Sequence, residues 1–487
     1  MTRLRLALDP VLARERGPEI RWTWRQLLTV IGWPWEEVSV GDECDVAFVA
    51  DPADGGRARV VVRADPEAWR RPGDLCLGGV RFDPPALAFD PSRENGAALV
   101  SAQEGRVVVR HDLVFDAFWL ATGQEESRFP HDAHGFRDLT GSAWSRSGIL
   151  REAVGSRIAA WLERALARVG LPAPVARWPA GRRAAAAISH DVDYPEVVRW
   201  LEPLRVIRRQ GVHAAGTALA VAAGRRHHWH FHDWIALERD LGTRSAFYFT
   251  PVRGSLLGYA VGPPDPFYDI EAPHFRALFA TLTDAGVEVG LHASYEAHRD
   301  RSRFAEERAR LARASGQPVH GNRHHYWHLD PADPDATLAI HERIGLVYDS
   351  SLIHNRYLGW RRGFCHPFYP FHRTERREIR TLQLPPGWMD DQLFGMRRDN
   401  PGDPAALLRD AAGRVAEAGG ALTVDVHDYV YDEALHPGWR DRLVELWQYL
   451  ADRGDFWFAT PFEIAEHWTA RAGRLGDAST GLEEGSA

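Results

Sequence analysis

The sequence contains no lysine, and all 59 of its basic residues are arginine. This absence excludes Schiff-base chemistry, a pyridoxal phosphate anchor and the lysine of a P-loop. No GxGxxG follows a strand-like segment either, so we expect no nucleotide site. The three cysteines, Cys44, Cys76 and Cys365, form no CxxC pair, which argues against a disulfide framework or a cysteine-based zinc site.

Long apolar runs and a basic charge balance are also missing. No apolar run approaches the roughly 18 residues of a membrane span, and the first residues contain no apolar stretch followed by a cleavage site. We therefore expect no membrane span, no signal peptide and a cytoplasmic location. The net charge of −8 gives no sign of the basic surface that binds nucleic acid, so no nucleic-acid partner is expected.

Histidine and tryptophan are abundant, with 23 and 19 residues. Histidine suits metal binding and proton transfer, and tryptophan suits flat apolar ligands such as sugar rings. Core packing is the simpler explanation for most of the tryptophans.

The first part of the chain, residues 1–176, mixes short strand-like runs with proline- and arginine-rich connections. It ends in a segment with helical apolar spacing at 155–170. Residues 171–183 carry three prolines and indicate a linker. We expect residues 1–176 to form a smaller mixed α/β N-terminal domain.

Beyond this linker, strand-like and helix-like segments alternate, which is typical of βα units around a parallel sheet. There are enough such units to close into a barrel, so we expect an α/β barrel domain at 177–472. The residues from 473 to 487 have the composition of a disordered tail.

Polar side chains recur where the predicted strands end. They follow the segments AAAAIS, VEVGL, PVHGN and LTVDV, and they are Asp191, Asp193, His292, Arg323, His325 and His427. In a parallel barrel these strand ends share the face on which active sites are built. Carboxylates and imidazoles that converge there suit zinc or a similar divalent cation. A free carboxylate and a histidine beside the metal would complete a site for amide or ester hydrolysis.

These segments resemble the five motifs of the polysaccharide deacetylase superfamily, also called the NodB-homology family. The resemblance covers about residues 183 to 470, and its motifs occur in the family's order: SHDVD, GLHASYEAH, GNRHHYW, PPGWMDDQL and LTVDVHDY. It implies a distorted (β/α) barrel, a carbohydrate substrate and a divalent metal ion, for which zinc is expected.

The resemblance also implies roles for individual residues. Asp191 would be the catalytic base, and Arg323 would orient it. The backbone amide of Tyr326 would help to bind the oxyanion. His427 would be the general acid, supported by Asp390.

The metal ligands implied by the resemblance are Asp193 and His292, but the third is open. The family's second motif usually has another histidine at the position that is Glu296 here. The candidates are His325, Glu296 and His298. We expect His325, because variants with HDVD and HxSY pair these motifs with an HY dipeptide in the third motif.

We therefore expect a metal-dependent carbohydrate deacetylase, acting on an N-acetylated sugar or glycan precursor in a surface-glycan pathway. The alternatives are hydrolysis of another C–N bond or of an O-acetyl ester, and a non-catalytic glycan-binding protein. The N-terminal region resembles the uncharacterised domain that precedes such barrels in surface-glycan gene clusters, and we expect it to pack on the barrel or help hold a glycan.

Overall fold

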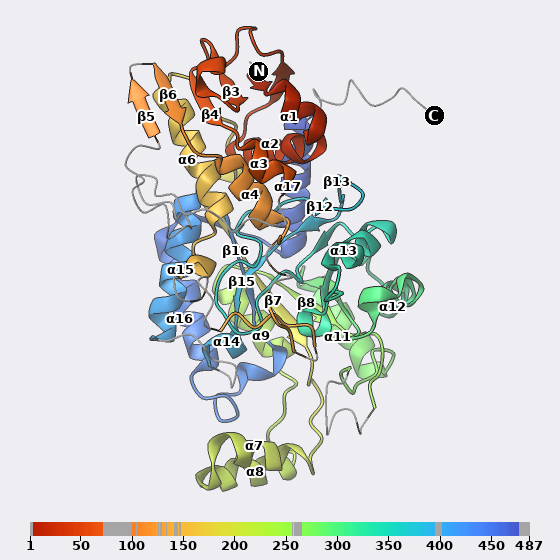
Figure 1. The fold of residues 1–487 in the computed structure, drawn as a ribbon. Helices are drawn as coiled ribbons and strands as arrows, with labels where there is room; N and C mark the ends of the chain where they lie inside the picture. The colour runs from red at the N-terminus through yellow and green to blue at the C-terminus, as the bar shows by residue number, and fades with distance from the viewer. Residues whose placement is uncertain are drawn as a thin grey trace.

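The structure is a computed structural model of the 487-residue chain. The residues that it describes are 3–71, 100–103, 105–124, 126, 129–132, 134–140, 145, 148–255, 257, 265–394 and 402–476. Two sheets organise the fold, one in the N-terminal region and one in the remainder of the chain (Figure 1).

The N-terminal sheet has six strands in the order β2-β1-β3-β4-β6-β5. They are β1 (Leu4–Leu8), β2 (Trp35–Val38), β3 (Val46–Val49), β4 (Val60–Arg63), β5 (Val100–Gln103) and β6 (Arg106–Val109). All neighbours are parallel except β5, which runs antiparallel to β6 at the edge. The valine run of β4 is buried, as expected for a parallel strand covered on both faces.

The helices of this region are α1 (Pro10–Glu15), α2 (Gly17–Ile31), α3 (Pro66–Arg70), α4 (Leu113–Ala121) and α6 (Val154–Arg168). Helices α2, α4 and α6 pack against one another. The region is therefore mixed α/β, as predicted.

The second sheet has nine strands, and every pair in it is parallel. Its path is β14-β11-β10-β9-β8-β7-β16-β15, with β17 also paired to β7. The strands are β7 (Ala184–Val192), β8 (Ser245–Phe249), β9 (Glu288–Ala293), β10 (Gly321–His324), β11 (Tyr348–Asp349), β14 (Leu382–Gln383), β15 (Pro386–Met389), β16 (Ala421–Asp425) and β17 (Phe456–Phe458). The sheet curls, but among the described residues its end strands β14 and β15 do not pair with each other. The sheet is therefore a distorted, open barrel.

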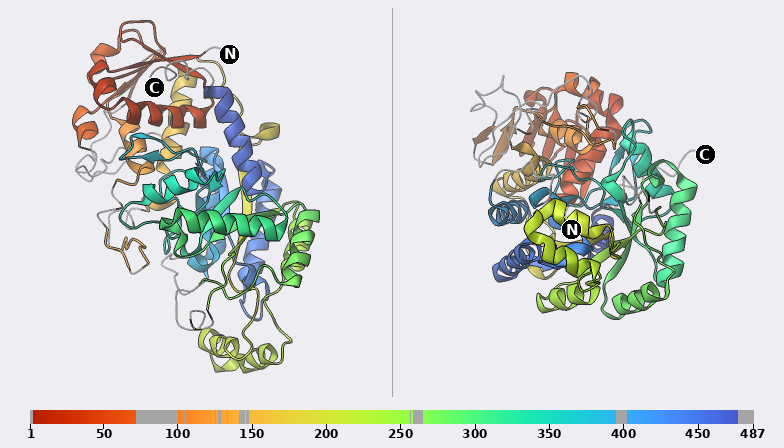
Figure 2. Two further views of the ribbon diagram at one scale, coloured as in Figure 1. Left: turned by 90° about the vertical axis from the view of Figure 1, so that its right-hand side faces the viewer. Right: turned by 90° about the horizontal axis from the view of Figure 1, so that it is seen from below.

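Helices surround this sheet, except α7 and α8, which project away from it, as the two further views show (Figure 2). They are α7 (Glu202–Gln210), α8 (Ala215–Ala222), α9 (Phe231–Asp240), α11 (Pro273–Asp284), α12 (Arg301–Ser315), α13 (Pro334–Arg343), α14 (Asp390–Leu393), α15 (Pro404–Ala418), α16 (Trp439–Arg453) and α17 (Pro461–Gly476). A two-stranded antiparallel ribbon, β12 (Phe371–His372) and β13 (Arg377–Glu378), lies outside the sheet. Over the ranges described, no helix is both long and apolar enough to cross a membrane.

Two glycines make room for tyrosines inside the barrel. A Cβ at Gly290 would lie 2.4 Å from the ring of Tyr248, and one at Gly321 would lie 1.9 Å from the ring of Tyr348. The two tyrosine hydroxyls are 2.8 Å apart, and the Arg323 guanidinium lies 4.7 Å from the Tyr248 ring centroid. Gly290 in β9 and Gly321 in β10 therefore leave the space in which the two tyrosines pack next to Arg323.

The predicted linker is part of the packed structure. Trp178 is 1% exposed, and its indole Nε1 donates a hydrogen bond to the carbonyl of Gly419 at 2.7 Å. One hydrophobic cluster runs from the N-terminal sheet into the barrel. At the other end, α17 continues through Gly476, so residues 473–476 are helical, contrary to the predicted tail; residues 477–487 lie outside the described part.

Candidate active site

The polar residues predicted from the sequence meet at one end of the barrel, where the parallel strands finish. Asp191 lies in β7 and Asp193 directly follows it, His292 lies in β9, and Arg323 lies in β10. Asp191 and Asp193 are two positions apart, so an extended backbone directs both side chains toward the same side of the sheet.

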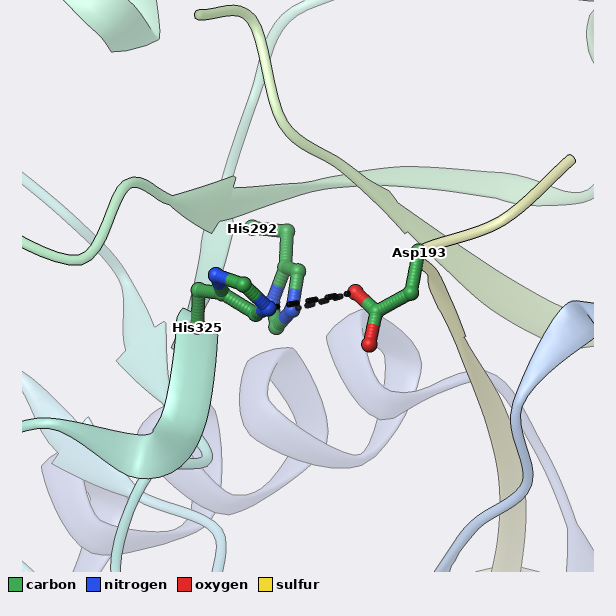
Figure 3. A group of neighbouring side chains, drawn as sticks. All are labelled: Asp193, His292 and His325. Atoms are coloured by element: carbon green, nitrogen blue, oxygen red, sulfur yellow. Dashed lines mark ion pairs between the residues drawn. The ribbon is translucent and has the colours of Figure 1, made fainter. Parts of the chain in front are cut away.

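Asp193, His292 and His325 form a compact, buried cluster (Figure 3). One ligand atom from each residue lies within 4.8 Å of the others. His292 Nε2 is 3.3 Å from Asp193 Oδ1, and His325 Nε2 is 3.7 Å from the same oxygen. Within the described ranges this is the group of histidine, cysteine and acidic residues that has the geometry to hold a metal ion.

The orientation of His292 suits a metal ligand. Its Nδ1 lies 2.8 Å from the backbone carbonyl of Arg323, which accepts a hydrogen bond from a protonated Nδ1. The neutral ring then presents the Nε2 lone pair toward Asp193. Asp193 Oδ1 is buried and accepts no hydrogen bond that meets normal geometry from the described residues. Two imidazoles and one carboxylate are a donor set that fits zinc and similar divalent ions.

The electrostatic surroundings of the cluster favour a cation. Burial by itself lowers the pKa of His292, but the carboxylates of Asp191 and Asp193 outweigh burial and hold that pKa above its usual value. Burial likewise opposes ionisation of Asp193, yet His325 and His292 keep its pKa below the usual range.

Asp191 is held apart from the cluster by Arg323. The guanidinium Nη1 donates to Asp191 Oδ1 at 2.8 Å, while Asp191 Oδ2 lies 3.9 Å from His292 Nε2. Burial raises the pKa of Asp191, but the charges of Arg323, His292 and His427 together outweigh burial and the pKa is lowered overall. Asp191 is therefore an ionised, fully buried carboxylate beside the three-residue cluster.

A second carboxylate, Asp425, shares the same arginine and was not among the predicted site residues. Its Oδ1 lies 2.9 Å from Arg323 Nη1, and it is fully buried at the end of β16. Burial, reinforced by the charge of Asp191, raises its pKa to about 8. Asp425 is therefore protonated at neutral pH, whereas Asp191 is ionised.

His427 and Asp390 form a pair on another side of the site. His427 Nδ1 is 2.8 Å from Asp390 Oδ1, and the His427 backbone N–H donates to the other carboxylate oxygen at 2.8 Å. His427 Nε2 points toward Asp193, at 3.6 Å from Oδ2. Burial lowers the pKa of His427, but Asp390, with a further contribution from Asp193, holds it well above the usual value. His427 is thus a protonated donor at neutral pH.

The backbone after His325 is strained. Tyr326 and Trp327 have φ values of 59° and 47°, a region that side-chain-bearing residues rarely adopt. Such conformations cost of order 1–3 kcal/mol each and occur at functional sites. The turn brings the chain sharply out of β10 immediately after the cluster residue.

The other two candidates for a third ligand lie elsewhere. Glu296 has a side chain 50% exposed and forms a surface ion pair with Arg299 at 3.3 Å. His298 is buried, but its Nδ1 lies 3.0 Å from the carbonyl of Tyr295 and its ring packs on His328. Neither residue belongs to the Asp193 cluster.

Two further residues near the cluster were not foreseen. Asp265 Oδ1 lies 3.7 Å from His325 Nδ1, within ion-pair range but beyond hydrogen-bond distance. His134, from the N-terminal region, has its Nδ1 2.9 Å from the Tyr295 hydroxyl and its ring 5.4 Å from that of Tyr326. The N-terminal region therefore packs against the loops that carry the site.

Comparisons with known proteins were made by sequence and by structure. No protein-family model matches the chain, and no curated protein matches it. Among solved structures, the chain is similar to a protein from Mycobacterium smegmatis described as a polysaccharide deacetylase, with 20% identity, a TM-score of 0.40, and coverage of 60% of this chain and 93% of that one. It is also similar to an allantoinase, with 15% identity, a TM-score of 0.40, and coverage of 62% and 95%.

A third similar structure is a protein from Pseudomonas aeruginosa PAO1, also described as a polysaccharide deacetylase, with 16% identity, a TM-score of 0.40, and coverage of 62% and 96%. These likenesses are weak in both identity and superposition. The solved structures that the chain resembles thus include polysaccharide deacetylases.

Proposed function

We propose that the protein is a metal-dependent hydrolase that removes the acetyl group from an N-acetylated sugar. The observation that carries this proposal is the placing of an ionised carboxylate, Asp191, and a protonated imidazole, His427, beside the cluster of Asp193, His292 and His325. Amide hydrolysis needs a base for water and an acid for the departing amine, and these two groups supply them.

Asp193, His292 and His325 would hold the metal ion, for which zinc is the proposed identity. A divalent ion bound there would polarise the acetyl carbonyl and make water more acidic. Asp193 serves as a ligand because its Oδ1 has no competing hydrogen bond. Asp265 contributes a carboxylate 3.7 Å from His325 Nδ1, on the side of the ring away from the cluster atom Nε2.

Asp191 acts as the base that takes the proton of the attacking water. Arg323 keeps this carboxylate ionised and fixes its position through a hydrogen bond of 2.8 Å. The backbone N–H of Tyr326 assists by stabilising negative charge on the acetyl oxygen.

His427 delivers its proton to the amine nitrogen as the C–N bond breaks. Asp390 holds the imidazole by its Nδ1, which leaves Nε2 directed into the site. The substrate class follows from the resemblance of the five motifs to polysaccharide deacetylases. We propose a cytoplasmic glycan precursor as substrate.

Elemental analysis of purified protein tests the metal site first. We expect about one metal ion per chain in the wild type and loss of that metal in Asp193→Ala, His292→Ala and His325→Ala. Glu296→Ala is the matched control and retains the metal, because Glu296 lies on the surface. Loss of metal with Glu296 rather than His325 would contradict the assignment.

Acetate release then tests the reaction. N-acetylated sugars are expected to release acetate with the wild type and far less with Asp191→Asn or His427→Gln, both of which retain metal. Faster release from O-acetylated sugars would favour an esterase. Sugar binding without metal and without acetate release would favour a non-catalytic glycan-binding protein.

A further inference from the structure

Helices α7 and α8 form a projecting pair. With their flanking residues, 199–226, they are called the α7–α8 arm here. The arm extends away from the barrel in both side views, and the chain enters it after leaving β7 (Figures 1 and 2). Its inner face has a small core in which Val206, Ala218 and Val221 pack with Leu435.

The arm exposes several large apolar side chains, which are called its apolar face here. Exposed fractions are 65% for Trp200, 65% for Leu204, 83% for Val212 and 74% for Leu219. Helix α8 has the sequence AGTALAVA, so no charged side chain lies on its solvent side. A surface helix normally directs polar residues outward, and an exposed apolar patch of this kind marks a contact surface.

The same segment is rich in arginine. Arg199, Arg208 and Arg225 form no ion pair with the part of the chain that the structure describes. The buried carboxylate of Glu202 is shared by two further arginines, Arg205 and Arg209. The arm is therefore locally basic on a protein whose net charge is −8.

The arm also borders the candidate active site. A pocket of about 240 Å³ lies between α7 and the barrel, and three of its lining residues are arginines of α7. Tyr194, which follows Asp193, and Tyr429, whose ring is 5.1 Å from that of His427, line the same pocket. The apolar face, the arginines and the site thus belong to one end of the molecule.

We propose that the α7–α8 arm docks the protein on an anionic lipid surface. The apolar side chains enter the boundary between headgroups and acyl chains, and the arginines contact lipid phosphates. Exposed apolar side chains and arginines on one projecting segment match this interface in apolarity and in charge. The proposal goes beyond the catalytic one, because docking does not depend on which bond the site hydrolyses.

Flotation of the full-length protein with lipid vesicles tests the proposal. We expect binding to phosphatidylcholine vesicles in which about one lipid in three is phosphatidylglycerol, and little binding to phosphatidylcholine alone. Leu204→Ser/Leu219→Ser lowers the partition coefficient by about tenfold per leucine because less apolar area is buried. Val11→Ser is the matched control, since Val11 is 44% exposed on α1, and it binds like the wild type.

The charge contribution is measured with Arg199→Gln/Arg208→Gln/Arg225→Gln. Each arginine near an anionic surface contributes about fivefold, so this variant loses roughly 100-fold in binding at low salt. The wild type likewise loses binding at about 0.5 M salt. Absence of wild-type binding to anionic vesicles would overturn the proposal. A second outcome would also overturn it: the protein does not bind vesicles but forms a dimer without lipid, and Leu204→Ser/Leu219→Ser abolishes that dimer. The apolar face would then be the contact surface for a second copy of the chain.

Discussion

Arg323 is the cation on which the buried carboxylates of the site depend. It is fully buried, and its Nη1 lies 2.8 Å from Asp191 and 2.9 Å from Asp425. Its Nη2 donates to the hydroxyls of Ser189 and Ser350 at 2.8 and 3.1 Å. Arg323→Gln removes the positive charge, so the buried carboxylate of Asp191 loses the guanidinium that donates a hydrogen bond to it.

The cost follows from which carboxylate is ionised. Burial raises the pKa of Asp425 to about 8, so this group is neutral at pH 7 with or without the arginine. Asp191 is the charge that loses its partner. Removing one member of a buried ion pair costs about 3–5 kcal/mol. At about 2 °C per kcal/mol for a domain of this size, the melting temperature falls by about 6–10 °C.

The destabilisation has a defined pH dependence. In the wild type, burial raises the pKa of Asp191, but Arg323 together with His292 and His427 outweighs burial and lowers that pKa below its ordinary 3.8, so the ion pair with Arg323 stabilises the fold above that pH and the effect is lost in acid. Arg323→Gln lacks this contribution. The gap in stability between variant and wild type is therefore larger at pH 8 than at pH 4.

Calorimetry of the wild type, Arg323→Gln, Asp191→Asn and the double variant measures this coupling. The double variant is expected to be more stable than the sum of the single changes predicts, because no uncompensated charge remains. Acetate release falls by about 10²–10⁴-fold in each of the three variants, since each loses a positioned ionised base. A coupling below about 0.5 kcal/mol, or an equal loss of stability at pH 4 and pH 8, would refute the reasoning.

Two other predictions concern the acid and the barrel interior. Asp390→Asn is expected to shift the alkaline limb of the kcat/KM profile to lower pH. Burial lowers the pKa of His427, and Asp390 is the largest influence that raises it. A pH–rate profile in which this limb does not move would contradict the prediction. Gly321→Ala lowers stability by about 1–3 kcal/mol in calorimetry, because its Cβ would lie 1.9 Å from the ring of Tyr348. Gly413→Ala in α15, where no atom lies within 4 Å of the new Cβ, raises stability by up to about 1 kcal/mol as the control.

The sequence by itself predicted the fold class. Alternating strand-like and helix-like segments predicted a parallel sheet, and the structure confirms a distorted barrel in which β7 is buried along its whole length. The polar residues that follow the predicted strands also predicted a shared face, because the ends of parallel strands meet at one end of a barrel. Such patterns are local, because the period of a strand or helix depends on neighbouring residues.

Only the tertiary structure showed which of the three candidates for a third ligand lies beside Asp193 and His292. Glu296, His298 and His325 are all near a motif, and sequence spacing does not tell which side chain turns inward. The register that pairs Arg323 with His292 places His325 beside the cluster, and the left-handed backbone that follows turns the chain away. That arrangement depends on how strands distant in the sequence align.

Asp425, Asp265 and His134 were missed for the same reason. Asp425 occurs within a recognised motif, but its partner Arg323 is about one hundred residues away along the chain, so nothing local marks its role. Asp265 and His134 lie outside every motif and approach the site only when separate segments pack together. The periodicity that predicts a strand or a helix depends on residues that are adjacent in the sequence. Burial, ion pairing and pKa shifts arise from contacts that exist only once the chain has folded.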